Sequence, residues 1–205
     1  MNKIQENMLS SLAAIFFLSG LSALIYQVCW QRLLFTGFGV DLTSITLIVS
    51  VFMAGLGIGA FFGGRIADKF SDKIIIIFCF IEFGIGAFGL FSHKSILFLQ
   101  EIFIHSNLII TALGCFILLL FPTFLMGTTL PLLTSFFNLY IKNIGDSIGR
   151  LYFYNTLGAA FGALATGFIL FNHFEILETI YIAAILNLAI SFIVFIVYGR
   201  KKYEK

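Results

Sequence analysis

The amino-acid sequence predicts an all-α membrane protein, a bundle of six transmembrane helices in a single domain that covers residues 1–205. Three observations support this prediction: the composition, the length of the apolar runs and the distribution of basic residues. Hydrophobic residues make up 60% of the chain and charged residues 11%, whereas soluble domains carry about 25% charged residues. A chain of 205 residues cannot hide this much apolar surface in a core, so its solvent is lipid.

The apolar runs between charged residues are long enough to cross a bilayer, which takes about 20 apolar residues. The first run could be mistaken for a signal peptide, but it continues past the usual length of a signal-peptide core. A further apolar segment, Ser95–Ile104, is too short to span, and we expect it to lie on the outer surface or to extend the fourth span. The predicted spans are approximately Leu9–Gln31, Leu42–Gly63, Ile74–Ser92, Asn107–Leu130, Arg150–Phe171 and Glu178–Tyr198.

Basic residues predict the orientation of these spans. If the N-terminus is cytoplasmic, all of the 12 lysines and arginines except Arg32 and Lys94 fall in cytoplasmic segments. Because cytoplasmic loops carry an excess of basic residues, this distribution places both termini in the cytoplasm and requires an even number of spans. We therefore predict a multi-pass protein of the cytoplasmic (inner) membrane, with the lipid bilayer as its first partner.

The second and fifth spans carry similar glycine patterns, AGLGIGAFFGG and LGAAFGALATG. The second span would run inward and the fifth outward, so the match indicates a possible 3+3 inverted repeat, an arrangement common in transporters. The third span of each half also holds a polar residue, Glu82 or Asn187. The alternative is that small residues recur wherever helices pack closely. The matched glycines, which we predict to be helix-packing positions, are Gly55 with Gly158, Gly59 with Gly162 and Gly64 with Gly167.

The fourth span departs from a plain helix. The chain stays largely apolar for 33 residues from Leu108 to Tyr140, which as one helix would reach about 50 Å against about 30 Å of hydrocarbon. Pro122 and Pro131 each remove a backbone donor. We predict a kink near Pro122 and a break near Pro131 into a cytoplasmic surface helix. This bend serves either packing alone or the shaping of a substrate pocket, in which case the prolines are structural or gating residues.

Glu82 is the clearest candidate for a functional residue. It lies among apolar residues, where a charged side chain costs about 3 kcal/mol on insertion scales and more by other estimates. Together with Tyr26 and Gln27 of the first span and Asn155 of the fifth, it is predicted to bind a substrate. The alternative is that Glu82 makes a structural hydrogen bond to an intramembrane Gln, Thr or Asn.

Trp30 and Arg32, near the end of the first span, fit an aromatic belt and a cation that reaches the membrane surface. The loop GGRIADKFSDK after the second span resembles the loop signature of the major facilitator superfamily, although Ser71 stands where that signature has glycine. In this loop, Asp68 is expected to bind a neighbouring helix N-terminus or Arg150 and so to latch one conformation. The matching positions are Gly64, Asp68, Lys69 and Lys73.

Several classes of protein are excluded by the motifs. The sequence has no phosphate-binding loop and no nucleophile elbow, and no two of its cysteines are closely spaced. The histidines fall near the outer ends of spans and are not spaced as metal ligands. We therefore expect no catalytic residue, no metal site, no cofactor and no nucleic-acid partner. The cysteines are Cys29, Cys79 and Cys115, and the histidines are His93, His105 and His173.

Four blocks of sequence occur in order over about residues 15–195: FFLSGLSALIYQVCWQRLL, GLGIGAFFGGRIADK, FPTFLMGTTLPLL and GRLYFYNTLGAAFGALATGFIL. They resemble the membrane domain of the membrane-bound spermidine synthase-like (polyamine aminopropyltransferase) family, which is major-facilitator-like. The family's catalytic domain has no counterpart here, which favours a non-enzymatic role. The family often has a glutamate after the tyrosine of its first span, where this chain has Gln27, so Glu82 would serve alone.

The resemblance implies a six-helix bundle similar to half of a major facilitator, with a polyamine-related role. Half-transporters seldom enclose a pathway alone, so we expect a homodimer or a partner subunit. The leading hypothesis is a transporter-type protein that handles a small cationic or amine metabolite. The alternative is a membrane scaffold that docks a separate cytosolic enzyme, such as an aminopropyltransferase, through Arg65–Lys73 and Asn138–Arg150. Membrane-embedded catalysis is a weaker third alternative.

Overall fold

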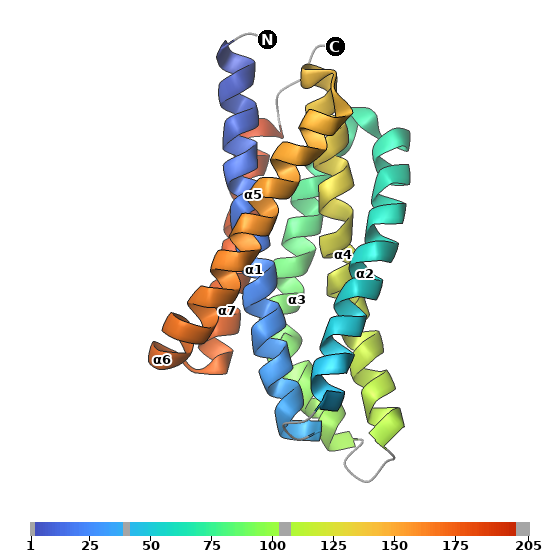
Figure 1. The fold of residues 1–205 in the computed structure, drawn as a ribbon, viewed down its shortest axis with the longest axis vertical. Helices are drawn as coiled ribbons and strands as arrows, with labels where there is room; N and C mark the ends of the chain where they lie inside the picture. The colour runs from blue at the N-terminus through green and yellow to red at the C-terminus, as the bar shows by residue number, and fades with distance from the viewer. Residues whose placement is uncertain (1–2, 39–41, 103–107, 200–205) are drawn as a thin grey trace.

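A computed structural model describes residues 3–38, 42–102 and 108–199 (Figure 1). These residues form helices, with no strand among them, and six of the helices are long and apolar enough to cross a membrane. This confirms the predicted all-α membrane bundle. The elements are α1 (Lys3–Phe38), α2 (Leu42–Lys69), a 3-10 turn (Ser71–Lys73), α3 (Ile74–Ile102), α4 (Leu108–Ile141), α5 (Ile144–Ala165), a π-helical turn (Thr166–Leu170), α6 (Phe171–His173) and α7 (Ile176–Tyr198).

Helix α3 is longer than the predicted third span and includes most of the segment that we expected on the surface or in the fourth span. That expectation is wrong, because the 29-residue helix α3 continues without interruption to Ile102. The Ser95 hydroxyl donates to the Phe91 carbonyl within the helix, at 3.0 Å. The Gln100 amide donates to the Leu33 carbonyl at 3.2 Å, which fastens this extension to α1.

Helix α4 contains Pro122 and Pro131 and runs through both to Ile141, so the predicted break near Pro131 is wrong. Threonine hydroxyls add hydrogen bonds along this stretch, for example from Thr128 to the Leu125 carbonyl at 2.7 Å. The chain turns instead at Lys142, whose φ of 54° lies in the left-handed region.

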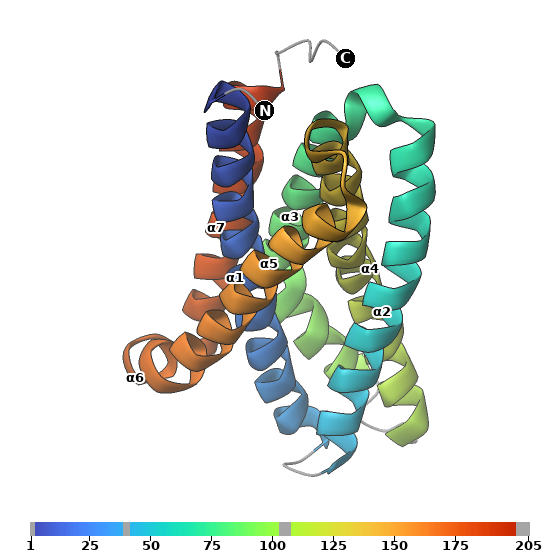
Figure 2. The ribbon, with the colours of Figure 1, turned by 45° about the horizontal axis from the view of Figure 1, so that its top comes forward.

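The helices pack in pairs that fit the possible inverted repeat. Helix α1 packs on α5, α2 packs on α4, and α3 packs on α7 (Figures 1 and 2). Further contacts join α3 with α4 and α1 with α7. If α1, α2 and α3 exchange places with α4, α5 and α7, these pairs map onto one another, as two related three-helix units would require.

Glycines allow the two outer helix pairs to approach closely. A Cβ atom at Gly158 or Gly162 of α5 would collide with a backbone carbonyl of α1, and one at Gly55 or Gly59 of α2 would collide with α4. Such contacts are typical of small residues between membrane helices. The third matched pair differs, because Gly64 and Gly167 both face open space. The expectation of close packing at Gly64 and Gly167 is therefore wrong.

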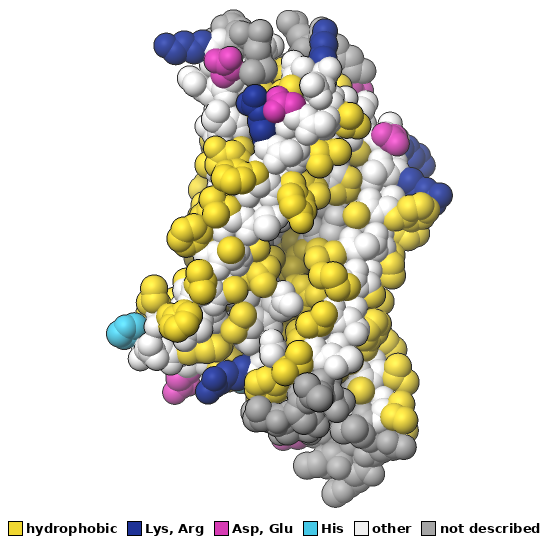
Figure 3. All heavy atoms as spheres, in the orientation of Figure 1, with side chains coloured by type: hydrophobic (Ala, Val, Ile, Leu, Met, Phe, Trp, Pro, Cys, Tyr) yellow, Lys and Arg dark blue, Asp and Glu magenta, His cyan; other side chains and the backbone are white. Residues whose placement is uncertain are grey.

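The core of the bundle lies along α3. Half of the membrane-spanning stretch of α3, 50%, is buried, against 17% for that of α5 and 28% for that of α2. Many large hydrophobic side chains are exposed, and on the face shown in Figure 3 they cover the middle of the bundle while the charged side chains gather towards its two ends. Both ends of the chain lie at the same end of the bundle (Figure 1), as an even number of spans requires. The protein is therefore a multi-pass integral membrane protein.

Candidate functional site

A cavity of about 330 Å³ lies between the α1–α5 pair and the α2–α4 pair. A hollow is visible on this face of the molecule in Figure 3. Side chains of α3 and α7, Ile85 and Asn187, contribute to its wall. The cavity is lined partly by apolar residues, including Phe52, Leu56 and Met126. Its polar lining consists of Ser19, Ser22, Gln27, Thr129, Tyr152, Asn155, Thr156 and Asn187.

Glu82 of α3 lies directly behind this wall and is fully buried. The Ser19 hydroxyl donates to its Oε1 atom at 2.6 Å, and the Asn187 amide donates to its Oε2 atom at 2.6 Å. Because Ser19 and Asn187 both line the cavity, Glu82 is separated from the cavity by single side chains. Two short bonds to a buried carboxylate offset part of the cost of removing it from water.

Asn187 joins the buried carboxylate to the cavity. Its Nδ2 group is used by Glu82, whereas its Oδ1 atom is buried and has no hydrogen-bond partner among the described residues. A buried acceptor without a donor is costly, and native structures normally satisfy such atoms with protein, water or ligand. The wall of the cavity therefore presents an acceptor that a donor group inside the cavity can satisfy.

Gln27 and Asn155, both predicted as substrate ligands, line the cavity. The side chain of Gln27 is half-buried and makes no hydrogen bond within the described part of the chain. The Nδ2 group of Asn155 donates to the Phe16 carbonyl at 3.2 Å, and its own backbone carbonyl packs against Gly20. Gln27 is therefore free to contact a ligand, while Asn155 also fastens α5 to α1.

Tyr26, the remaining predicted ligand, points away from the cavity. It is fully buried between α1 and α3 and stacks on Trp30 at a centroid distance of 5.0 Å. Its hydroxyl lies against Gly89 and has no partner among the described residues. Trp30 is also fully buried and donates to the Ser92 hydroxyl at 3.1 Å. The assignment of Trp30 to an aromatic belt is therefore wrong, because this side chain belongs to the core.

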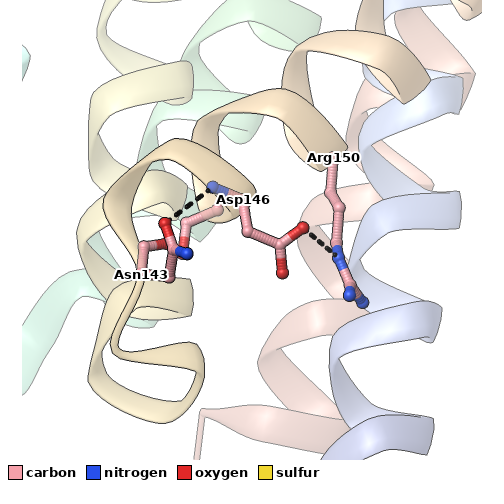
Figure 4. A network of polar contacts seen from close by, with 4 residues as sticks. Asn143, Asp146 and Arg150 are labelled. Carbon is pink, nitrogen blue, oxygen red and sulfur yellow. Dashed lines mark hydrogen bonds and ion pairs between the residues drawn. The ribbon is translucent and has the colours of Figure 1, made fainter.

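The predicted contact between Asp68 and Arg150 does not form in the described residues. Arg150 pairs with Asp146 of its own helix at 3.0 Å, next to the Asn143 side chain that caps α5 (Figure 4). Asp68 is exposed and makes no ion pair with any residue that the structure describes, and Lys69 lies over the Phe70 ring at 5.4 Å. An exposed pair such as Arg150–Asp146 contributes little to stability, so this region has no strong latch in the observed conformation.

Sequence reasoning missed Ser19 as part of the site. One face of α1 carries Ser19, with Ser22 three residues and Gln27 eight residues further along the chain, and all three line the cavity. That spacing within an apolar span was the available signal. Asn187 was noted as the counterpart of Glu82 in the other half, but the hydrogen bond between them needed the packing of α3 on α7.

A six-span helical bundle around a partly polar cavity is typical of transporter-type membrane proteins. The chain matches the Major Facilitator Superfamily over residues 10–205 and belongs to it. It is similar to a polyamine aminopropyltransferase of Oceanobacillus iheyensis, with 28% identity over 171 residues, which are 83% of this chain and 32% of that protein. The chain thus spans about a third of the length of the relative. No solved structure matches it.

Proposed function

We propose that this protein binds a small amine in the cavity and carries it across the membrane. The observation that carries the proposal is the Glu82 carboxylate, held by Ser19 and Asn187 directly behind the cavity wall. An ammonium group in the cavity would donate to the unpartnered Oδ1 atom of Asn187 and to the Gln27 amide oxygen. The charge of Glu82 would then compensate that of the ammonium group in a region where an isolated charge is costly.

The lining of the cavity favours a cation over an anion. None of the described residues that line it is a lysine, arginine or histidine. Its volume of about 330 Å³ lies at the small end of the range for small-molecule sites, about 300–1,000 Å³. The similarity to a polyamine aminopropyltransferase adds support for an amine. Linear polyamines and smaller amines are therefore the first ligands to test.

The proposal includes a second subunit that closes the cavity. Met53 of α2 is 61% exposed and Tyr152 of α5 is 59% exposed, although both line the cavity. A polar cavity bordered by such exposed residues is incomplete as a membrane pathway. We infer that a second copy of this chain or a partner subunit covers this face. We also propose that both termini lie in the cytoplasm.

Thermal unfolding of the purified protein in detergent with putrescine, spermidine or spermine tests the binding step. An amine present at 100 times its dissociation constant should stabilise the folded state by about 2.7 kcal/mol. We expect this shift to disappear in Glu82→Gln and to persist in Glu101→Gln, since Glu101 is exposed at the end of α3. Gln27→Leu should also reduce the shift, and it breaks no hydrogen bond of the described residues, because Gln27 makes none among them.

If no amine shifts the unfolding of the wild-type protein, the proposal is wrong. The docking of a cytosolic enzyme would then become the leading function. Charge reversal at Lys69 and Lys73, which are exposed, should weaken co-purification of such an enzyme and leave the bundle folded.

A further inference from the structure

A second cavity, of about 450 Å³, lies towards the end of the bundle opposite the termini. At this end of the bundle, α1 and α4 extend farther than the α5–α7 hairpin, which turns back at α6 (Figures 1 and 2). Helix α3 also continues for nine residues beyond His93, about 13 Å. The turn at α6 therefore leaves a space beside the longer helices α1 and α3, and the cavity lies there. Arg32 of α1, His93 of α3, Phe171 of α6 and Glu175 before α7 line this cavity.

The charged groups that line this cavity are of opposite sign and do not pair with each other among the described residues. The guanidinium carbon of Arg32 lies 5.3 Å from the centroid of the Phe171 ring, and Arg32 makes no ion pair in the described part of the chain. Glu175 is held in place by a capping box, in which its side chain accepts from the Glu178 backbone and Glu178 accepts from the Glu175 backbone at 2.9 Å. Arg32 and Glu175 therefore border one space and carry opposite charges that do not pair with each other in the described part of the chain.

This arrangement discriminates between ligand charges. A simple anion would meet Arg32 but would also be repelled by Glu175 and Glu178, which already compensate the positive end of the α7 dipole. A simple cation would meet these carboxylates but would be repelled by Arg32. A ligand with an anionic group and an ammonium group satisfies both sides of the cavity. The charges thus favour a zwitterion.

We propose that this cavity binds the head group of a zwitterionic phospholipid with a primary ammonium group. The phosphate would bind Arg32, whose planar guanidinium can donate two parallel hydrogen bonds, with His93 beside it. The ammonium would donate to the Glu175 carboxylate.

A lipid fits this position better than a soluble zwitterion does. Phe174, which also lines the cavity, is 44% exposed. Phe168 and Ile169, in the neighbouring π-helical turn, are 72% and 56% exposed. Phe174 therefore offers an apolar surface for acyl chains beside the charged groups, and Phe168 and Ile169 add exposed apolar surface on the preceding turn. The proposal is independent of the amine transport proposed above, because it uses none of the residues of the first cavity.

Lipid titration of the full chain in detergent, followed by thermal unfolding, tests this site. The lipids are phosphatidylethanolamine, phosphatidylcholine and phosphatidylglycerol with the same acyl chains. Phosphatidylethanolamine should stabilise the protein at the lowest concentration, because phosphatidylcholine lacks ammonium N–H donors and phosphatidylglycerol lacks the cation. Arg32→Gln should weaken the apparent affinity for phosphatidylethanolamine by about tenfold or more, since it removes charge-assisted hydrogen bonds.

Arg65→Gln is the matched control, because Arg65 is also exposed and also lies over a phenylalanine, Phe61, at 4.1 Å. It should leave the response to each lipid unchanged. Glu175→Asn keeps a residue that caps helices well and should remove the preference for phosphatidylethanolamine over phosphatidylcholine. Equal responses of the wild-type protein to all three lipids would overturn the proposal. So would the same Arg32-dependent shift with soluble phosphoethanolamine, which would assign the site to a free zwitterion.

Discussion

Replacing Ser19 with alanine removes one of the two donors to the buried Glu82 carboxylate. The bond is 2.6 Å long and its acceptor, the Glu82 carboxylate, is fully buried, so removing the serine hydroxyl leaves a buried charge with one donor fewer. A hydrogen bond to a charged group contributes about 1.5–3 kcal/mol, and we expect Ser19→Ala to lower the free energy of unfolding by that amount. Ser11→Ala is the control, because the exposed Ser11 hydroxyl bonds only its own helix, at the Asn7 carbonyl. Its effect should stay within about 0.5 kcal/mol.

The assay is unfolding by SDS in mixed micelles, followed by the fluorescence of Trp30. This residue is the single tryptophan of the chain. It is buried between α1 and α3, the two helices that the Ser19–Glu82 bond also joins. In a Glu82→Gln background the same serine substitution should cost much less, because no charge is left unpartnered. The two substitutions should therefore couple by about 1 kcal/mol or more. Equal losses in both backgrounds would refute the argument that Ser19 acts through the carboxylate.

Three further predictions concern packing and capping. Gly162→Val should destabilise the bundle by about 1–3 kcal/mol in the same SDS assay, because the new side chain meets the Leu21 carbonyl, whereas Gly57→Ala should have little effect in open space. Tyr26→Phe should leave the thermal stability unchanged or raise it, because the Tyr26 hydroxyl has no hydrogen-bond partner among the described residues. A clear loss of stability would contradict this and indicate that the hydroxyl does have a partner. Asn143→Ala should cost about 0.5–2 kcal/mol of unfolding free energy through the lost cap of α5, and no loss would contradict that role.

The number of spans could be predicted from the sequence because lipid enforces it. Every crossing needs about 20 apolar residues, and the runs that meet this length are visible without any knowledge of packing. The ends of the helices were harder to predict. Beyond the hydrocarbon a helix can be held by tertiary contacts that the sequence does not reveal, such as the bond from Gln100 to the Leu33 carbonyl, which fastens the end of α3 to α1. Likewise, Pro131 does not end α4, because the residues on both sides of it remain helical.

The candidate site could be predicted only in part. Glu82 could be identified from the sequence, because a carboxylate in an apolar span is costly and normally has a structural or functional role. Its partner Ser19 could not be identified, because serine in a membrane helix often bonds its own backbone and then carries no functional signal. The burial of Tyr26 and Trp30 also depends on which face of α1 meets α3. Composition does not reveal that face, because most faces of such a helix are apolar.

Uptake of radiolabelled spermidine into proteoliposomes tests the central claim most directly. We predict that wild-type protein and Glu101→Gln accumulate the amine, that Glu82→Gln does not, and that excess unlabelled amine competes with the label. Absence of uptake by the wild-type protein, or undiminished uptake by Glu82→Gln, would contradict the account of an amine pathway beside the buried carboxylate.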